Sequence, residues 1–586
     1  MKILKNEDKL ILKIVLLYRP YIKRISIILV CILFSSGISM LIPQISKNMM
    51  DNGFITGDTA VVIRLSALAL ALVIIDQALG ILETVNQAYL NSIIPYNLSK
   101  KAFKHIMGLR IQYFNNVGIT ELMSNINTDV ANIAKITDQS TFYIITSIFK
   151  IFGGLIGLLL IDCKLTLMVI LILPLRYFIV KYLAKLRKKS IEDFMKANEE
   201  YSAWFGDTLG GIREIKLWSL KRVKCGEFIK KQRSMIKCNI KLNIVDKANI
   251  LSESIMFQII FSALYIAGAY MISEKSFTVG GMFAFVTYSA NVMSPISAIL
   301  NIGYSFSGIL PSAERLFNFF DLEKEGGIAV KLPRSKEIKG SIRFENVSFC
   351  YKKREQVLKN ISFEIKQGEK VAIIGANGSG KSTLINILLR FYQPGEGEVF
   401  IDNENINRIN LEDYRSLISV VSQDNYLFNA SVEDNVFLPN KVSKIKALDI
   451  ATKKKIDSFI SKLPDGYKSE VGKNGSKLSG GQRQKIVLSR AMAKNAKIII
   501  MDEGTSFLDY ESEEQINRFI SDECRDKTVI AVTHKYDILK KMDCVLLLDR
   551  GRLNDSGTHD ELLLRNELYR EAILSSASSS SKKLQA

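Results

Sequence analysis

The first half of the chain alternates long apolar stretches with strongly basic polar ones. Six apolar stretches lie near residues 24–43, 60–91, 141–162, 164–186, 248–272 and 278–306. Each is about as long as the ~20 residues that an α-helix needs to cross the hydrocarbon core of a bilayer. The pattern therefore predicts six transmembrane helices within residues 1–320. Buried helices of a soluble protein would not need runs such as ISIILVCILFSSGISMLI.

Basic residues predict how these helices are oriented. Residues 1–24, 100–135 and 181–247 hold 7, 5 and 17 basic residues against 2, 2 and 8 acidic ones. Because cytoplasmic loops carry the excess of lysine and arginine, these segments and both chain ends are predicted to be cytoplasmic. The charged start lacks a small-residue cleavage pattern, so we do not expect a removable signal peptide. The predicted location is the cell membrane, or the inner membrane of a cell with two.

Three ionisable residues, Asp76, Lys150 and Arg176, fall near the predicted middle of the bilayer. Each costs ~2.5–3.5 kcal/mol there on insertion scales, so each is expected to face a cavity, water or another such group. One interpretation is a polar substrate path. The other is structural: an interhelical pair such as Asp76 with Arg176, and a Lys150 that reaches the interface.

The second half has a different pattern and indicates a separate domain. SIRFENVSFCY and VLKNISFEI alternate as strands do, and KVAII at 370–374 is typical of a buried parallel strand. A chain of 586 residues also exceeds the size of one domain. The predicted fold class is an α-helical membrane domain fused to an α/β domain. The predicted boundaries are a transmembrane domain at 1–320, a linker at 321–340, the second domain at 341–572, and a Ser-rich, disordered tail at 573–586.

Composition and charge narrow the class of protein. Hydrophobic residues make up 48% and charged residues 24%, which excludes a wholly disordered chain. The net charge is +20, but residues 1–320 alone hold 36 basic and 21 acidic residues. The excess therefore follows the positive-inside bias, and no nucleic-acid partner is expected. Seven dispersed cysteines without a CxxC pair indicate neither a disulfide framework nor a zinc site.

A phosphate-binding loop follows the KVAII strand. GANGSGKST at 375–383 fits GxxxxGK[ST] between a strand and a helical segment. Its glycines let backbone N–H groups approach the phosphates, Lys381 supplies charge to the outer phosphates, and Ser382 can ligate magnesium. The predicted nucleotide contacts in this loop are Gly375, Asn377, Gly378, Ser379, Gly380, Lys381, Ser382 and Thr383.

A second buried strand ends in two carboxylates, in the segment IIIMDEG. Asp502 is placed to hold magnesium, and Glu503 to orient or deprotonate a water for in-line attack on the terminal phosphate. The carboxyl ends of parallel strands are where ligands bind in such sheets.

Between these motifs lies LSGGQ, at 478–482, before a helical segment. This order of elements resembles the ATP-binding cassette superfamily, and the six spans before it resemble its exporter half-transporters, over residues 25–572. The resemblance implies that the α/β domain at 341–572 is a nucleotide-binding domain, an α/β P-loop ATP-binding cassette fused to the α-helical membrane domain. The resemblance implies that Ser479, Gly480, Gly481 and Gln482 contact ATP, and that Tyr351 stacks on its adenine. It further implies that Gln423 links magnesium to the membrane domain, that His534 positions the terminal phosphate, and that Asp509 lies at a dimer interface.

The chain departs from the family pattern at three positions. DEGTSFLD replaces the usual DEATSALD, so Gly504 and Phe507 stand where alanines are usual and dimer packing is expected to differ. Lys473 stands where many exporters have glutamate, which puts that contact with the membrane domain in doubt.

The resemblance also implies a dimer and a mechanical coupling. LSGGQ points away from its own phosphate loop in this family, so ATP is sandwiched between two copies, or between this chain and a related half-transporter. The stretches around Tyr113–Phe114 and around Trp204 and Ile212 resemble the coupling regions, and short helices are expected there, near Gln423.

The predicted function is an ATP-hydrolysing exporter that uses ATP and magnesium and works by alternating access. An ATP-gated channel or transport regulator is the alternative, and a soluble DNA-associated ATPase is disfavoured by the six spans. Peptide, small amphiphile and lipid all remain open as substrates, with a slight preference for a peptide or small metabolite. Membrane lipid is an expected partner.

Overall fold

The computed structural model describes residues 2–115, 117–295, 309–326, 338–351, 356–422, 426–438, 460, 463–502, 520, 524–533 and 535–582. The chain divides into two compact units. The first comprises residues 1–108 and 117–322, and the second comprises residues 109–116 and 323–586. The second unit is thus built from two separated pieces of chain. We call residues 109–116 the connecting segment, because they join two helices of the first unit.

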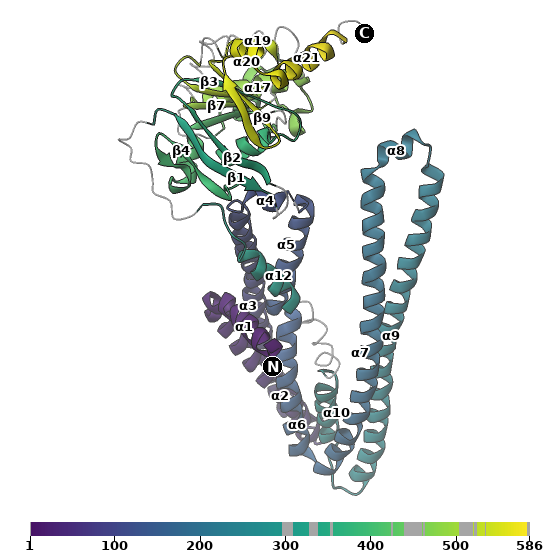
Figure 1. Ribbon diagram of the computed structural model, residues 1–586. Helices are drawn as coiled ribbons and strands as arrows, with labels where there is room; N and C mark the ends of the chain where they lie inside the picture. Colours follow the sequence, from purple (N-terminus) through teal and green to yellow (C-terminus); the bar gives the residue numbers. More distant parts are fainter. Residues whose placement is uncertain are drawn as a thin grey trace. The chain divides into compact units, whose positions relative to one another are not determined.

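The first unit is helical (Figure 1). Its helices are α1 (Lys2–Tyr18), α2 (Ile22–Met49), α3 (Thr59–Ile106), α5 (Ile119–Ala134), α6 (Gln139–Ile161), α7 (Cys163–Gly210), α8 (Ile212–Leu217), α9 (Lys221–Ser273), α10 (Val279–Met293) and α12 (Ile309–Phe320). Aspartates begin two of the long helices. Asp58 accepts a 2.9 Å hydrogen bond from Ala60 N, and Asp162 one of 2.8 Å from Leu165 N. Each satisfies first-turn N–H groups that have no partner within the helix.

Five helical stretches among the described residues are long and apolar enough to cross a membrane: Leu10–Phe54, Thr59–Ile106, Glu121–Ile161, Cys163–Gly210 and Lys221–Ser273. They contain the first five predicted spans. The sixth prediction, 278–306, is represented by α10, whose 15 residues are shorter than a span. Residues 296–308 lie outside the described residues. The helical transmembrane domain is confirmed, and its sixth span stays a prediction.

Glycines let α6 pack closely against α10. A Cβ on Gly154 would lie 2.7 Å from Val292 Cγ2, and one on Gly157 would lie 2.7 Å from the Tyr288 ring. Small residues at such contacts let transmembrane helices approach each other closely. The helices α7 and α9 run side by side, with the short α8 at their end (Figure 1).

Arg176 and Asp76 are held by different partners, so the suggested pair between them is wrong. Arg176, on α7, is 1% exposed and donates to Glu253 Oε2 at 2.8 Å and Ser252 Oγ at 3.0 Å, both on α9. Asp76, on α3, accepts a hydrogen bond from Ser35 Oγ on α2. The helix pairing decides this, because α7 packs against α9 and α3 against α2.

The described residues of the second unit form two sheets. The strands are β1 (Ile342–Cys350), β2 (Gln356–Ile365), β3 (Lys370–Ile374), β4 (Glu396–Ile401), β5 (Glu404–Asn405), β6 (Ile418–Val421), β7 (Ile498–Asp502), β8 (Thr528–Val532), β9 (Cys544–Asp549) and β10 (Arg552–Gly557). One sheet has the order β2-β1-β4-β5 and its pairs are antiparallel. The other has the order β10-β9-β3-β8-β7-β6, parallel except for β10.

The helices of the second unit are α4 (Ile111–Phe114), α13 (Lys381–Leu388), α14 (Leu411–Ser416), α15 (Val432–Val436), α17 (Gly480–Ala493), α19 (Tyr536–Leu539), α20 (His559–Arg565) and α21 (Glu567–Lys582). Successive residues of a strand in the six-stranded sheet point to opposite faces, and each face packs into a separate hydrophobic core. Ile500 packs with α13 and the antiparallel sheet, whereas Ile499 packs with α17. This alternation follows from the period-2 geometry of strands.

The tail differs from the expectation of disorder from residue 573. Helix α21 continues to Lys582. Its start is anchored by Tyr569, 0% exposed, and Ile573, 8% exposed. Extending an anchored helix costs little, even through serines.

Candidate functional site

The phosphate loop joins β3, a buried strand inside the six-stranded sheet, to α13. Two of its glycines have φ values that strain an L side chain, +82° at Gly378 and +105° at Gly380. A Cβ on Gly380 would also lie 2.6 Å from Leu358 Cδ2, whereas one on Gly378 would meet nothing within 4 Å. The loop is therefore tight against the protein at Gly380 and open at Gly378, where a ligand can approach.

Two polar side chains of the loop fit an anionic ligand. Lys381 is 7% exposed, and its Nζ donates to the carbonyl oxygens of Gly375 at 2.6 Å and Ala376 at 3.1 Å. Ser379 is 3% exposed, and among the described residues its Oγ has no hydrogen-bond partner. Such a buried hydroxyl costs ~1–3 kcal/mol, which a phosphate oxygen would offset. With the first-turn N–H groups of α13, this set fits a nucleotide triphosphate.

The remaining loop residues lie where the motif predicts. Asn377 and Ser382 are exposed at the loop and in the first turn of α13. Thr383 is buried, and its Oγ1 lies 3.1 Å from the Tyr351 hydroxyl. Tyr351 is 37% exposed, which leaves part of its ring free for a planar base. The structure thus brings the predicted adenine-stacking residue next to the phosphate loop.

The sheet brings the second phosphate motif to the same edge. Asp502 ends β7, and the neighbouring strand β8 aligns Val532 both with Asp502 and with Ile373 on β3. All three strands are parallel, so their carboxyl ends meet at one edge. Asp502 therefore lies on the side of the sheet where the phosphate loop begins.

The three predicted catalytic residues, Glu503, His534 and Gln423, lie outside the described residues. The same holds for Gly504, Phe507 and Asp509, which are expected at a dimer interface. The strands that precede the catalytic residues are described. These strands are β7 before Glu503, β8 before His534 and β6 before Gln423. Since β6 pairs in parallel with β7, all three strands end at the edge that carries Asp502.

The LSGGQ segment forms the exposed start of α17. Ser479 is the N-cap, and its side chain and that of Gln482 cap each other's backbone N–H groups at 3.2 Å and 2.9 Å. Ser479 and Gly480 are exposed, and a Cβ on Gly481 would meet nothing within 4 Å. A helix N-terminus attracts anions, because it carries unpaired N–H groups and a partial positive charge. The predicted residues thus form an exposed helix N-terminus with open space in front of Gly481. Lys473 is exposed as well.

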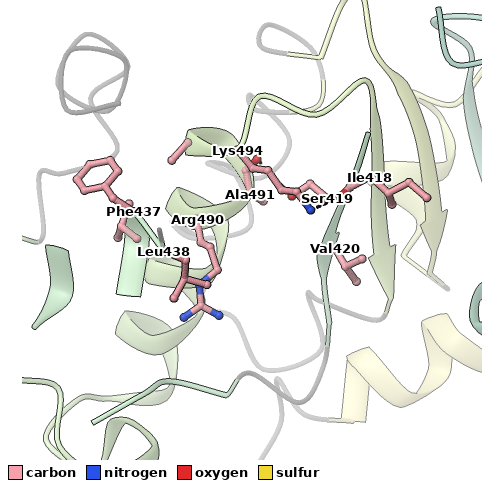
Figure 2. Close-up of a pocket in the computed structure, with 10 residues that line it drawn as sticks. Ile418, Ser419, Val420, Phe437, Leu438, Arg490, Ala491 and Lys494 are labelled. Atoms are coloured by element: carbon pink, nitrogen blue, oxygen red, sulfur yellow. Dashed lines mark hydrogen bonds between the residues drawn. The ribbon is translucent and has the colours of Figure 1, made fainter. Parts of the chain in front are cut away.

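A cavity of about 320 Å³ lies between β6 and α17, and its lining shares no residue with the phosphate loop (Figure 2). Its cations are bound by carbonyl oxygens. Lys494 Nζ donates to Arg415 O at 2.8 Å and Ile418 O at 2.6 Å, and Arg490 Nε donates to Asn435 O at 2.7 Å. Burial lowers the pKa of both side chains. These bonds attach α17 to α15, to α14 and to the start of β6.

Both predicted coupling regions contain a short helix. Tyr113 and Phe114 belong to α4 in the connecting segment, and Ile212 begins α8, in the first unit. Trp204, near the end of α7, donates its indole N–H to Glu227 Oε2 at 2.8 Å. The expected groove near Gln423 falls outside the described residues.

Sequence reasoning missed the contacts that hold the connecting segment on the cassette. Gln112 Nε2 donates to Phe391 O at 3.4 Å, and Asn115 Nδ2 donates to the Tyr392 hydroxyl at 2.9 Å. These pairs are 279 and 277 residues apart in the sequence. No local pattern marks such residues.

Two family models match the chain. The model described as ABC transporter matches residues 358–506, and the one described as ABC transporter transmembrane region matches residues 25–296. The matched regions contain the phosphate loop, LSGGQ and five of the six predicted spans.

Curated relatives match nearly the whole chain. An ATP-dependent lipid A-core flippase of Legionella pneumophila (strain Paris) is 28% identical over 531 residues, with 90% of each chain covered. An ABC transporter ATP-binding protein of Streptococcus pneumoniae serotype 4 is 28% identical, with 96% of this chain and 97% of that protein covered. Among solved structures, a bacterial Atm1-family ABC exporter with ATP bound gives a TM-score of 0.78 at 22% identity, covering 95% of this chain and 98% of that one. This last likeness concerns the fold.

Proposed function

The chain belongs to the ABC transporter family as a fused half-transporter of the exporter type, an ATPase coupled to transport, and on that premise we propose that two copies of it export an amphiphilic lipid. ATP binding closes the two cassettes on each other, and hydrolysis releases them. The membrane helices then alternate between two facings.

The exposed start of α17 is the observation that supports the dimer. Ser479, Gly480 and Gly481 form an anion-binding surface that is open in the single chain. The phosphate loop, with its buried and unpartnered Ser379 hydroxyl among the described residues, is the complementary half. One chain carries both halves, so two identical chains suffice to form two complete sites. A related half-transporter remains the alternative partner.

The roles at the nucleotide follow from the chemistry of the residues. Lys381 and the N–H groups of α13 bind the phosphates, and Tyr351 stacks on adenine. Glu503 orients or deprotonates the attacking water, and His534 positions the terminal phosphate. Asp502, Ser382 and Gln423 offer the oxygen ligands that Mg²⁺ prefers, and the ion would neutralise charge on the phosphates.

The topology proposed is six spans with both ends and the cassette in the cytoplasm of the cell membrane. Support comes from the five long apolar helices, from α10 as the described part of the sixth, and from the basic segments 100–135 and 181–247.

An amphiphilic lipid is the substrate class that the relatives support, since several are described as ATP-dependent lipid A-core flippases. The Arg176 charge is paired with Glu253, so this arginine is accounted for within the protein and does not by itself indicate an anionic substrate.

The test measures ATP hydrolysis by the purified chain in lipid nanodiscs, with added lipids, amphiphilic drugs or peptides. Amphiphilic lipids are expected to stimulate turnover, and a fluorescent lipid should then change leaflet in vesicles when ATP is added. The Glu503→Gln variant is the control that binds ATP without moving lipid. Stimulation by peptides and not by lipids would refute the substrate class, and lipid movement equal in this variant would refute active export.

A further inference from the structure

The connecting segment (residues 109–116) is bound to one loop of the cassette, residues 390–393, which follow α13. Leu109 forms an antiparallel bridge with Lys324, and α4 follows it. Asn115 Nδ2 then donates to the hydroxyl of Tyr392 at 2.9 Å. The segment links α3 to α5, both of them helices of the membrane domain.

The other side of Tyr392 contacts the aromatic residue that is placed to bind adenine. The ring centroids of Tyr392 and Tyr351 lie 5.1 Å apart at 85°, and Phe349 lies 5.4 Å from Tyr392 at 72°. Edge-to-face pairs of this kind have a preferred geometry, so a ring that is fixed restricts its neighbour. Tyr351 in turn contacts Thr383 of α13 through its hydroxyl, at 3.1 Å.

Arg415 holds another residue of this loop, Phe391, in place. Arg415 binds Glu325 through two nitrogens, at 2.8 Å and 3.2 Å, and its guanidinium lies 4.9 Å from the Phe391 ring centroid. A cavity of about 170 Å³ beside the loop is lined by Arg110, Gln112 and Glu325 among others. The loop is thus held at Phe391, while the connecting segment has free volume beside it.

We propose that Tyr392 is a positioning residue through which binding of the nucleotide base at Tyr351 orders the connecting segment. Stacking of a base on Tyr351 restricts that ring, the edge-to-face contact restricts Tyr392, and the Tyr392 hydroxyl holds Asn115. A ligand that has phosphates and no base leaves the Tyr351 ring unstacked and does not produce this ordering. The inference rests on the proposed ATP site and adds a role for the base.

The experiment measures hydrogen–deuterium exchange of the full chain in lipid nanodiscs. Two peptides are followed: residues 109–118, which report the connecting segment, and residues 375–384, which report the phosphate loop. The ligands are the β,γ-imido analogue of ATP and inorganic tripolyphosphate, each with Mg²⁺ and at saturation. Tripolyphosphate carries three phosphates and no base, so it separates the two parts of the nucleotide.

In the wild-type chain the ATP analogue should slow exchange of peptide 109–118 by roughly fivefold relative to tripolyphosphate, the effect of one hydrogen bond of about 1 kcal/mol. Both ligands should protect peptide 375–384. Tyr392→Phe keeps the ring and removes the hydroxyl, so it should lose the difference at 109–118 and keep protection at 375–384. Asn115→Ala should do the same, and the double variant should behave like either single one.

Four outcomes of the exchange experiment would contradict a part of the proposal. Equal protection of peptide 109–118 by both ligands would overturn the role of the base, and full protection in Tyr392→Phe would overturn the role of Tyr392. Independent effects of Asn115→Ala and Tyr392→Phe in the double variant would overturn the contact between them. If neither ligand protected peptide 375–384 in the wild type, the proposed ATP site itself would be wrong.

Discussion

Gly481→Ala separates what the LSGGQ segment does for the fold from what it does for ATP hydrolysis. Gly481 is the second residue of α17, and a Cβ there would meet no atom within 4 Å. In the single chain the methyl group therefore fits without strain. In a nucleotide sandwich the same methyl would stand between the helix N-terminus and the partner's phosphates.

The two effects have opposite signs. Alanine is favoured over glycine by ~0.8–1.0 kcal/mol in a helix interior, and we take about half of that near the N-terminus. The cassette should therefore gain roughly 0.5 kcal/mol, or about 1–2 °C in Tm for a unit of this size. Overpacking a close contact costs about 1–3 kcal/mol. ATP hydrolysis should thus fall by roughly 10- to 100-fold, since about 1.4 kcal/mol corresponds to tenfold.

The assay pairs thermal unfolding of the purified protein with ATPase activity in lipid nanodiscs. Gly226→Ala is the matched control, because Gly226 lies inside α9 and a Cβ there also meets nothing within 4 Å. It should raise Tm and leave ATP hydrolysis at the wild-type rate. Should Gly481→Ala hydrolyse ATP as fast as this control, the LSGGQ segment does not press against a nucleotide.

Three further results are expected. Lys381→Ala should weaken ATP binding by roughly 10- to 100-fold, because a charged hydrogen bond contributes about 1.5–3 kcal/mol; titration with a fluorescent ATP analogue measures it, and unchanged affinity would exclude Lys381 from the site. Glu253→Ala should destabilise the membrane domain by about 3 kcal/mol, since it leaves the buried Arg176 charge without its carboxylate. The double variant Arg176→Met with Glu253→Leu should recover most of this loss. Thermal unfolding in detergent tests both variants, and an equal loss of stability in the double variant would contradict the reasoning. Burial lowers the pKa of His559 below its usual 6.5, so the folded state favours the neutral ring, and the free energy of unfolding should fall as pH drops below about 6.5. Unfolding measured between pH 5 and 8 should show a weaker pH dependence of stability in His559→Gln than in the wild type. An unchanged pH dependence would assign the effect to other groups.

The strand, loop and helix of the phosphate-loop motif could be predicted because these parts are local in sequence. A buried strand, a glycine loop, Lys381 and a helix follow one another within about twenty residues, and each part favours the same structure. The LSGGQ helix is local for the same reason, since its capping residues Ser479 and Gln482 are three positions apart.

Contacts between distant segments could not be predicted in this way. Arg176 and Glu253 are 77 residues apart, and their pairing depends on which faces of α7 and α9 meet. Arg415 and Glu325 are 90 residues apart, in a loop and a helix that carry no motif. Hydropathy fixes that a helix spans the membrane and leaves its rotation about its own axis undetermined, because lipid-facing and protein-facing sides are both apolar.

The connecting segment has a consequence for how the protein is made. Residues 109–116 are synthesised long before the cassette that binds them, since residues 323–586 complete that unit. When α3 and α5 leave the ribosome, the segment that joins them therefore has no surface to bind, because the cassette has not yet been synthesised. Phe391 and Tyr392 have to emerge before Gln112 and Asn115 can form their hydrogen bonds. Docking of the connecting segment therefore has to wait for the cassette, and a product truncated before residue 391 would lack both of these hydrogen bonds.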